Sequence, residues 1–194
     1  MTGLYFVRHA QPDYRTGTDR TFSLSEEGMS DRLKALEALK GIRIDAAFSS
    51  PYRRSLLTIE PILNQRNLTV TTDERLRERV KGQGQCNTSE MFIKRWADHN
   101  FCEPGGESLA QTQKRNIEAV SEILDTYRDK NILIGTHGTA LCTIINFYDG
   151  NFGYEDFMRA IDFMPWVIRL DFEGCEYKGR EEIAFIEKEF HGCL

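Results

Sequence analysis

The apolar residues of this chain fall into short continuous runs, separated by longer segments in which apolar positions recur every three or four residues. The continuous runs are typical of buried strands, and they cover residues 4–7, 44–50, 68–72 and 131–135. The periodic segments predict helices over residues 25–41, 51–67, 89–100, 107–130 and 139–150. Strands that alternate with helices in this way predict an α/β fold with a mostly parallel central sheet.

Capping residues and prolines set the expected ends of the first two helices. Ser25 is suited to cap the first helix, and Gly41 is suited to stop it. Pro51 fits the first turn of the second helix. Pro61 lacks a backbone donor, so we expect it to kink or end that helix.

The last part of the chain departs from the alternation of strands and helices. Residues 166–174 and 181–190 read as two strands separated by a glycine-bearing turn, which predicts an antiparallel edge to the sheet. We expect residues 1–194 to form a single domain, in which residues 79–108 are an inserted substrate-specificity segment. The loop-rich stretch 146–157 is a second region expected to contribute to specificity.

Composition argues against several classes of protein. The net charge of −5 and the pI near 5.5 disfavour nucleic-acid binding, which requires a basic surface. No stretch resembles a membrane span or a signal peptide, so no membrane partner is expected. The five cysteines are an odd number without a Cys-x-x-Cys pair. That usage is typical of free thiols in the cytoplasm, and not of a disulfide framework or a metal site.

Cationic and imidazole side chains gather where the expected parallel strands end. The residues concerned are Arg8 and His9 after the first strand, Arg53 and Arg54 one turn beyond the second, and His137 after the strand at 131–135. The carboxyl ends of parallel strands meet at one edge of a sheet, and ligands bind outside that edge. Two of the four histidines of the chain are therefore expected in one crevice.

These side chains suit a tetrahedral anion. Guanidinium groups match phosphate oxygens bidentately, and helices starting near Pro51 and Gly138 are expected to add free backbone donors. Flanking arginines hold a histidine neutral and nucleophilic. The alcohol that leaves during phosphoryl transfer needs a proton, and Glu78 is the carboxylic acid that we expect to supply it. Such a reaction runs without a metal when enough cations are fixed in place.

Each feature has a purely structural alternative when it is taken alone. Arg53 and Arg54 could be ordinary surface charge on a helix, and the alternating Arg75, Arg77 and Arg79 could form one face of an exposed strand. The chain carries no Walker loop, no His-Glu-x-x-His and no Gly-x-Ser-x-Gly. The joint placement of cations and histidines at strand ends favours a phosphoryl site.

Six short motifs resemble, in their order, those of the histidine phosphatase superfamily, the phosphoglycerate mutase-like proteins. They are FVRHAQ at 6–11, LSEEG at 24–28, SSPYRRSLLT at 49–58, LRE at 76–78, PGGES at 104–108 and THG at 136–138. The resemblance implies a three-layer α/β/α fold. It also implies a reaction that uses neither a metal nor an organic cofactor.

The resemblance further implies roles for single residues. His9 matches the nucleophile that becomes a phosphohistidine, and Arg8 matches its phosphate-binding neighbour. Arg54 falls at the arginine of the third motif, and His137 at the second histidine, which binds the phosphoryl group. Glu78 falls where the family often places its proton donor.

Some positions depart from the family pattern. Thr136 replaces the usual serine before the second histidine, and Arg15 stands where many members carry an asparagine that helps to hold the phosphate. After Glu78 the sequence lacks the usual glycine and Trp-Glu-Gly triplet, which makes its substrate side unusual. We expect Gln11, Arg15 and Gly138 to join Arg8, Arg54 and His137 in substrate binding.

The resulting hypothesis is a phosphatase that hydrolyses a small phosphorylated metabolite. A phosphoglycerate mutase-type isomerase is the rival enzyme, and it would respond to a bisphosphorylated primer with little net release of phosphate. A non-catalytic phosphate-ester-binding or protein-interaction module is the rival from another class, and it would bind without releasing phosphate. A protein phosphatase is also compatible with an arginine-rich rim. The sequence does not indicate an oligomeric state.

Overall fold

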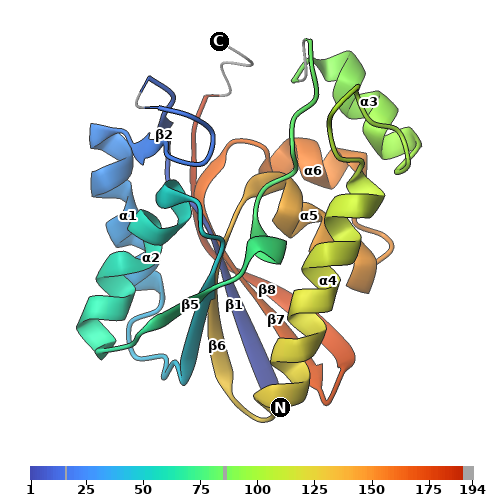
Figure 1. Ribbon diagram of the computed structural model, residues 1–194. Coiled ribbons are helices and arrows are strands. Elements are labelled where there is room, and N and C mark those ends of the chain that lie inside the picture. Colours follow the sequence, from blue (N-terminus) through green and yellow to red (C-terminus); the bar gives the residue numbers. More distant parts are fainter. Residues whose placement is uncertain (16, 85–86, 190–194) are drawn as a thin grey trace.

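A six-stranded sheet forms the centre of the computed structural model, which describes residues 1–15, 17–84 and 87–189. Its strand order is β5-β4-β6-β1-β7-β8 (Figure 1). The strands are Thr2–Arg8 (β1), Ala46–Ser49 (β4), Val70–Thr72 (β5), Asn131–Thr136 (β6), Phe163–Glu173 (β7) and Glu176–Glu187 (β8). The first four of these pair in parallel, whereas β7 and β8 pair antiparallel. The predicted mostly parallel sheet with an antiparallel edge is confirmed.

Helices cover both faces of this sheet. The helices are Glu26–Ala38 (α1), Arg53–Arg66 (α2), Ser89–Ala97 (α3), Leu109–Thr126 (α4), Gly138–Tyr148 (α5) and Tyr154–Ala160 (α6). In Figure 1, α1 and α2 lie on one side of the sheet, and α4, α5 and α6 lie on the other. This is the three-layer α/β/α arrangement that the motifs implied.

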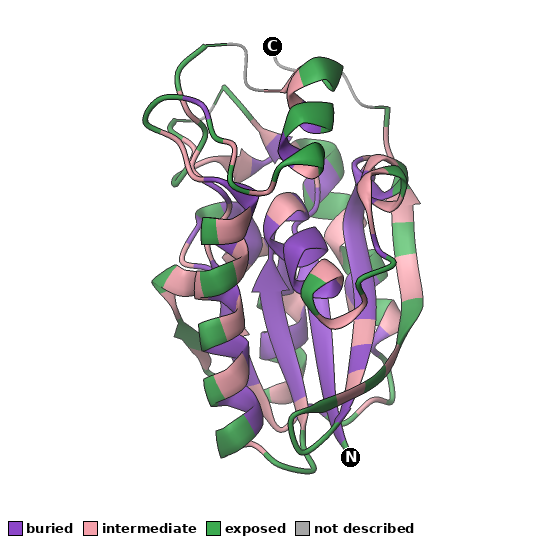
Figure 2. Ribbon diagram, turned by 90° about the vertical axis from the view of Figure 1, so that its right-hand side faces the viewer, coloured by how far each residue is buried: buried purple, intermediate pink, exposed green. Residues whose placement is uncertain are grey.

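The alternation of side chains along β1 explains why both faces are covered. Successive strand residues point to opposite faces. Leu4 and Phe6 belong to the apolar cluster under α4 and α5, whereas Tyr5 and Val7 belong to the cluster under α1 and α2. All four are buried, and Figure 2 shows the central strands buried between helices with exposed outer faces. Burial on both sides requires the continuous apolar run that the sequence shows.

Pro61 does not end α2, which runs without a break through Arg66. A proline inside a helix leaves the carbonyl four residues earlier without its usual donor. That carbonyl belongs to Leu57, and it accepts a hydrogen bond of 2.7 Å from the Arg32 guanidinium of α1. A neighbouring helix therefore supplies the missing donor, and of the two outcomes expected at Pro61, an end of the helix is wrong.

Pro51 lies outside α2, because the helix begins at Arg53. The hydroxyl of Ser50 accepts a hydrogen bond from the amide of Tyr52, 3.2 Å away, and Tyr52 is extended. The sequence-based start is therefore two residues too early. Residues 51 and 52 thus precede the helix, and the ring of Tyr52 lies against that of His137, with centroids 5.1 Å apart.

Several shorter elements differ from the sequence-based expectation. The helix expected over 89–100 ends at Ala97, where Asp98 instead accepts a hydrogen bond from the amide of Asn100. A short hairpin of β2 (Pro12–Asp13) and β3 (Ser23–Leu24) and the helix α6 were not predicted. The stretch 146–157, expected as loop, contains the end of α5 and the start of α6.

The interpretation of the alternating arginines as one face of an exposed strand is wrong. Glu74–Leu76 is a turn of 3-10 helix, and the chain that follows is irregular. Arg75 and Arg77 are partly buried in ion pairs, and Arg79 is almost fully buried. The irregular path places these side chains in different environments.

The C-terminal strands pair as expected, but β8 begins at Glu176, earlier than the sequence indicated. The last position of that expected strand, Phe190, lies outside the described residues, as do Cys86 and Cys193. Cys102, Cys142 and Cys175 are free thiols. Over the described ranges, no helix is both long and apolar enough to cross a bilayer.

The strand register brings the candidate residues to one level. Arg8 pairs with Thr136 across β1 and β6, and Ser49 pairs with Gly135 across β4 and β6. The residues that follow these pairs, His9, Ser50 and His137, therefore emerge together at the carboxyl edge of the sheet.

Candidate active site

A cavity of about 430 Å³ opens at the carboxyl edge of the sheet. Six residues expected at the site line it, namely Arg8, His9, Gln11, Arg54, Glu78 and Gly138. Its outer walls come from the loop before β3, from the segment around α3, and from α6. Segments far apart in the sequence thus meet around one space.

His9 is held as a neutral imidazole in a defined orientation. Its amide donates to the carbonyl of Thr136, and its Nδ1–H donates to the carbonyl of Ala10, at 2.8 Å. A carbonyl oxygen only accepts, so Nδ1 carries the proton and Nε2 carries the lone pair. Burial lowers the pKa of His9 well below 6.5, with further lowering from the charges of Arg54 and Arg8.

His137 is fully buried beside His9. Its Nε2 lies 2.7 Å from the hydroxyl of Ser50, which also accepts the amide of Tyr52. A hydroxyl oxygen has two lone pairs, so Ser50 satisfies both contacts either by donating to Nε2 or by accepting an Nε2–H together with the amide. Nδ1 has no hydrogen-bond partner among the described residues. Burial lowers the pKa of His137 well below its usual value, and the nearby charge of Arg54 adds to this.

Arg8 is anchored at the C-terminus of α6. Its two terminal nitrogens donate to the carbonyls of Ala160 and Ile161, at 2.6 and 2.9 Å. Its Nε is buried without a partner in the described part of the chain. Gly138 makes this position possible, because a Cβ there would lie only 3.0 Å from the Arg8 Cζ and 3.1 Å from Nε. Gly138 therefore lets a guanidinium lie against the first turn of α5.

Arg54 is buried on the first turn of α2, whereas the adjacent Arg53 is exposed. The Arg54 guanidinium lies over the ring of Tyr52, 5.0 Å from its centroid. It donates to the backbone carbonyl of Asp19 and forms an ion pair of 3.2 Å with the Asp19 carboxylate. The guanidinium thus already binds an anionic group at the edge of the cavity.

The loop after β1 is tied to α2 one turn beyond Arg54. The hydroxyl of Thr58 accepts the amide of Ala10 at 2.9 Å and donates to the carbonyl of Arg54 at 2.8 Å. Gln11 is held in turn by contacts with Ser25 and Gly28. The hydroxyl of Ser25 donates to the side-chain oxygen of Gln11. Gly28 packs so closely that a Cβ there would lie 2.2 Å from the backbone carbonyl oxygen of Gln11. The second motif of the sequence therefore supports the loop that follows His9.

Glu78 occupies the N-terminus of α5. Its carboxylate accepts the amides of Thr139 and Ala140, each at 3.0 Å, and that of Arg79 at 2.8 Å. The expectation that the N-terminal amides of this helix are free for a phosphate is wrong for Thr139 and Ala140, because Glu78 binds both. The contact instead fixes both carboxylate oxygens at the wall of the cavity.

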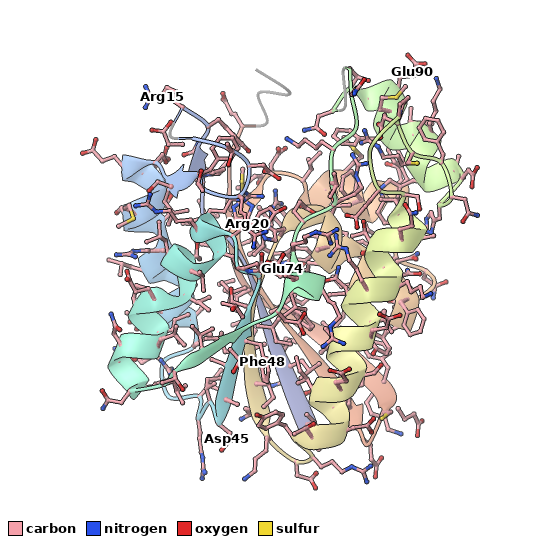
Figure 3. All side chains as sticks on the ribbon, viewed as in Figure 1. Arg15, Arg20, Asp45, Phe48, Glu74 and Glu90 are labelled. Carbon is pink, nitrogen blue, oxygen red and sulfur yellow. The ribbon has the colours of Figure 1, made fainter. Side chains whose placement is uncertain are left out.

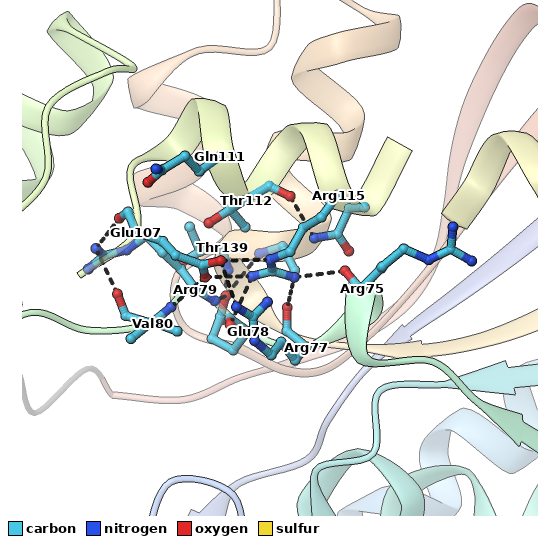
Figure 4. A network of polar contacts seen from close by, with 12 residues as sticks. Arg75, Arg77, Glu78, Arg79, Val80, Glu107, Gln111, Thr112, Arg115 and Thr139 are labelled. Carbon is cyan, nitrogen blue, oxygen red and sulfur yellow. Dashed lines mark hydrogen bonds and ion pairs between the residues drawn. The ribbon is translucent and has the colours of Figure 1, made fainter. Parts of the chain in front are cut away.

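A partly buried ion-pair network holds the turn that carries Glu78 (Figure 4). Arg115 of α4 donates to the carbonyls of Arg75 and Arg77 at 2.7 Å and of Glu78 at 3.0 Å. Glu107 binds Arg115, Arg77 and the amide of Val80. The backbone on both sides of Glu78 is therefore fixed to the start of α4.

Two expected site residues do not line the cavity, namely Arg15 at the surface and His137, which is fully buried beside His9. The side chain of Arg15 is 90% exposed and pairs with the carboxylate of Asp13. Figure 3 shows Arg15 at the outer edge of the molecule, away from the cavity wall. The departure from asparagine at this position thus leaves the pocket without a side chain from residue 15.

Sequence reasoning did not assign to the site five charged residues that line the cavity, namely Asp19, Arg79, Lys81, Arg95 and Glu189. Arg95 lies three positions after Phe92 on the buried side of α3. A cation on the apolar face of a helix was the available signal, since a charge is seldom buried without a partner. Asp19 lies in a polar loop and gave no such signal.

A family model described as histidine phosphatase superfamily (branch 1) matches residues 4–163. Among curated proteins, a 2,3-bisphosphoglycerate-dependent phosphoglycerate mutase of Mesorhizobium japonicum is 30% identical over 173 residues, covering 78% of this chain and 84% of that relative. The match includes all six motifs by position along the chain.

Solved structures resemble the whole chain. A mycobacterial glucosyl-3-phosphoglycerate phosphatase in complex with VO3 has a TM-score of 0.75 at 20% identity, covering 96% of this chain and 99% of that one. A phosphoserine phosphatase of Entamoeba histolytica in complex with 3-phosphoglyceric acid has a TM-score of 0.74 at 19% identity, covering 97% and 98%. At these identities the likeness establishes the fold.

Proposed function

The chain belongs to the histidine phosphatase superfamily, and we propose that it hydrolyses phosphate monoesters of small metabolites through a phosphohistidine on His9. The phosphoryl group passes first to His9 and then to water. The proposed reaction needs no metal and no organic cofactor, because fixed cations stabilise the transferring group.

The observation that carries the proposal is the tautomer of His9. Nδ1–H is bound to the carbonyl of Ala10, which leaves the lone pair of Nε2 without a hydrogen bond from any described residue in a ring that lines the cavity. Because burial and two arginines lower the pKa of His9, the ring is neutral at pH 7. A neutral imidazole with one oriented lone pair is a competent nucleophile.

The groups around His9 fit a phosphoryl group. Arg8 lines the cavity, and its Nε is a buried donor without a partner among the described residues, so a phosphoryl oxygen would satisfy it. His137 packs against His9 outside the cavity lining, and its Nδ1 likewise has no partner among the described residues. Arg54 already binds the carboxylate of Asp19, so a phosphate can take the place of that carboxylate. Donors aimed at developing negative charge are the main means of catalysing phosphoryl transfer.

Glu78 completes the proposed cycle. In the proposed cycle Glu78 enters as the carboxylic acid. Nε2 of His9 attacks phosphorus, the P–O bond to the alcohol breaks, and the leaving oxygen takes the carboxyl proton of Glu78, which becomes the carboxylate. Glu78 then accepts a proton from a water molecule that attacks the phosphohistidine, which releases phosphate and restores both residues. The three amides that bind its carboxylate keep Glu78 at the cavity wall throughout.

A mutase is the second candidate, because the relative from Mesorhizobium japonicum carries that activity in its name. A mutase returns the phosphoryl group to a sugar acid and must keep water away from the phosphohistidine. The names of the two structural neighbours support hydrolysis, since both are phosphatases. We therefore place hydrolysis first.

We propose that residues 79–108 act as the specificity segment, that the substrate is a small phosphorylated metabolite, and that the protein works in the cytoplasm. Four residues of the segment near α3 line the cavity beyond the phosphoryl group, among them Phe92 and Trp96. Their position supports contact with the alcohol part of the substrate.

The test is release of phosphate from an aryl phosphate in excess EDTA. We expect activity in the wild type and in a His99→Ala control, and loss of activity in His9→Ala. His99 lies outside the cavity lining, so it reports the effect of removing an imidazole elsewhere. Full activity in His9→Ala would refute the proposal.

A second assay separates hydrolase from mutase. The enzyme is supplied with a phosphoglycerate and a bisphosphorylated primer, and both isomer exchange and free phosphate are measured. Net phosphate without isomer exchange supports the hydrolase. Primer-dependent exchange with little phosphate would assign the chain to the mutases instead.

A further inference from the structure

Two buried arginines share one buried carboxylate in the wall of the cavity. Arg79 and Arg95 both pair with Glu103, and their side chains are 4%, 3% and 7% exposed respectively. Both arginines line the cavity. A buried charge is stable only when it is paired and hydrogen-bonded. This group of three therefore carries one positive charge more than its own carboxylate balances.

Arg79 directs its unused donors at the cavity. All of its hydrogen bonds are made by Nη1, which reaches Glu103 at 3.2 Å and the carbonyls of Glu107 and Val80 at 2.8 and 3.4 Å. Nε and Nη2 have no partner among the described residues, and neither is enclosed by protein. The free edge of a nearly buried guanidinium thus lies at the cavity surface.

The neighbouring Arg115 differs from Arg79 in how many of its guanidinium nitrogens bind protein acceptors. Its three nitrogens all donate to protein acceptors, with Nε and Nη2 bound to Glu107 and Nη1 bound to backbone carbonyls. Arg79 is more deeply buried but uses only one nitrogen in this way. The difference indicates that Nε and Nη2 of Arg79 are kept for a ligand.

The surroundings strengthen such a contact. Lys81 lines the same cavity two residues further along and forms no ion pair with the described residues. Phe92 and Trp96 also line this cavity and give it an apolar surface. An ion pair is stronger where apolar groups lower the local dielectric. The wall therefore combines a fixed guanidinium fork, a mobile ammonium group and an apolar lining.

We propose that Arg79, assisted by Lys81, binds a second anionic group of the substrate, a carboxylate or a second phosphate, while the first phosphate lies at His9. This inference rests on the proposed function for the position of the first phosphate. The Nε–Nη2 edge of a guanidinium matches two oxygens of either group. The substrate class is thus a phosphomonoester with an anionic group at its other end.

Binding of non-hydrolysable phosphonates tests this without relying on turnover. Isothermal titration calorimetry compares alkylphosphonates of several chain lengths that end in a methyl group, a carboxylate or a second phosphonate. At the best length we expect the wild type to bind a doubly anionic ligand about tenfold more tightly than the methyl-ended one, as for one charge-assisted pair. Preference for the carboxylate or for the phosphonate identifies the anion.

Three variants locate the site. Arg79→Met is expected to remove the preference, Lys81→Met to reduce it, and Arg79→Lys to retain part of it. Arg128→Met is the matched control, because this arginine is 70% exposed and lies beyond the end of α4, and its preference should equal that of the wild type. If Arg79→Met does not fold, Arg79→Lys and Lys81→Met still carry the test.

Equal affinities for methyl-ended and anionic ligands in the wild type would overturn the inference. So would an unchanged preference in both Arg79→Lys and Lys81→Met. A wild type that hydrolyses aryl phosphates without this preference refutes only the second anion site. A wild type that shows the preference but releases no phosphate refutes only the proposed hydrolysis.

Discussion

The imidazole of His9 meets that of His137 edge to face, with ring centroids 5.2 Å apart and ring planes inclined by 63°. Both rings follow β1 and β6, which pair in register at Arg8 and Thr136. Burial and the charge of Arg54 lower the pKa of each. Two neutral imidazoles therefore lie together at pH 7, and the lone pair on Nε2 of His9 is the one that faces the cavity without a hydrogen bond from the described residues.

Arg54 and Arg53 give a matched pair of substitutions. Arg54→Ala removes a buried guanidinium at the cavity, and we expect kcat/KM to fall by about 100- to 1,000-fold, as when one oxyanion donor is lost. Arg53→Ala removes an exposed guanidinium from the next position, and we expect a change of less than about twofold. Steady-state kinetics with an alkyl phosphate measure both. Similar losses in the two variants would contradict a specific role for Arg54.

Glu78→Gln tests proton donation. An alkoxide leaving group needs a proton, whereas a nitrophenolate hardly does. We expect kcat to fall by about 100-fold or more on alkyl phosphates and much less on nitrophenyl phosphate. Glu118→Gln, at an exposed position of α4, is the control. Equal losses of Glu78→Gln on both substrates would mean that another residue donates the proton.

Arg115 is expected to act as a positioning residue for Glu78, because it binds three carbonyls of the turn that carries it. Arg115→Ala should lower kcat by about 10- to 100-fold, the range that a small misplacement produces, and mainly on alkyl phosphates. Arg115→Lys should recover only part of this, since an ammonium group lacks the guanidinium fork. Lys114→Ala, at the exposed neighbouring position, is the control. A loss that is uniform across leaving groups would indicate general destabilisation instead.

The free energy of unfolding should fall as the pH falls below about 6.5. The folded protein holds His9 and His137 at lowered pKa values, so the unfolded chain takes up protons first and acid favours unfolding. Each histidine contributes up to about 1.4 kcal/mol per pH unit. Urea denaturation at several pH values between about 7 and 5 gives the free energy of unfolding at each pH. This free energy should change less with pH in His137→Gln than in the wild type or in His99→Gln. An unchanged pH dependence would show that His137 takes up its proton equally in both states.

The sequence was sufficient to predict the sheet because burial on both faces requires continuous apolar runs. The strands at 4–7 and 131–135 follow directly from that rule. The helix does not end at Pro61, because the compensating donor, Arg32, comes from another helix. A contact of this kind between two helices cannot be predicted from the local sequence of either helix.

The same distinction applies to the candidate site, where residues at strand ends could be predicted and contacts that depend on loop paths could not. His9, Arg54 and His137 follow strand ends, so their convergence could be predicted from topology. The contact between Glu78 and the amides of α5, and the pairing of Asp19 with Arg54, depend on loop paths that no periodicity describes. Arg15 was placed by resemblance alone, and its loop directs it to solvent.

The central claim is that His9 carries the phosphoryl group, and the most direct measurement is the covalent intermediate itself. The wild type is mixed with nitrophenyl phosphate, quenched rapidly in base, digested and examined by mass spectrometry. We expect one phosphoryl group on the peptide that contains His9, appearing and decaying fast enough to account for turnover, and none on that peptide in His9→Ala. Phosphate release at the full rate with no phosphorylated peptide, or with the phosphoryl group on another residue, would contradict the account.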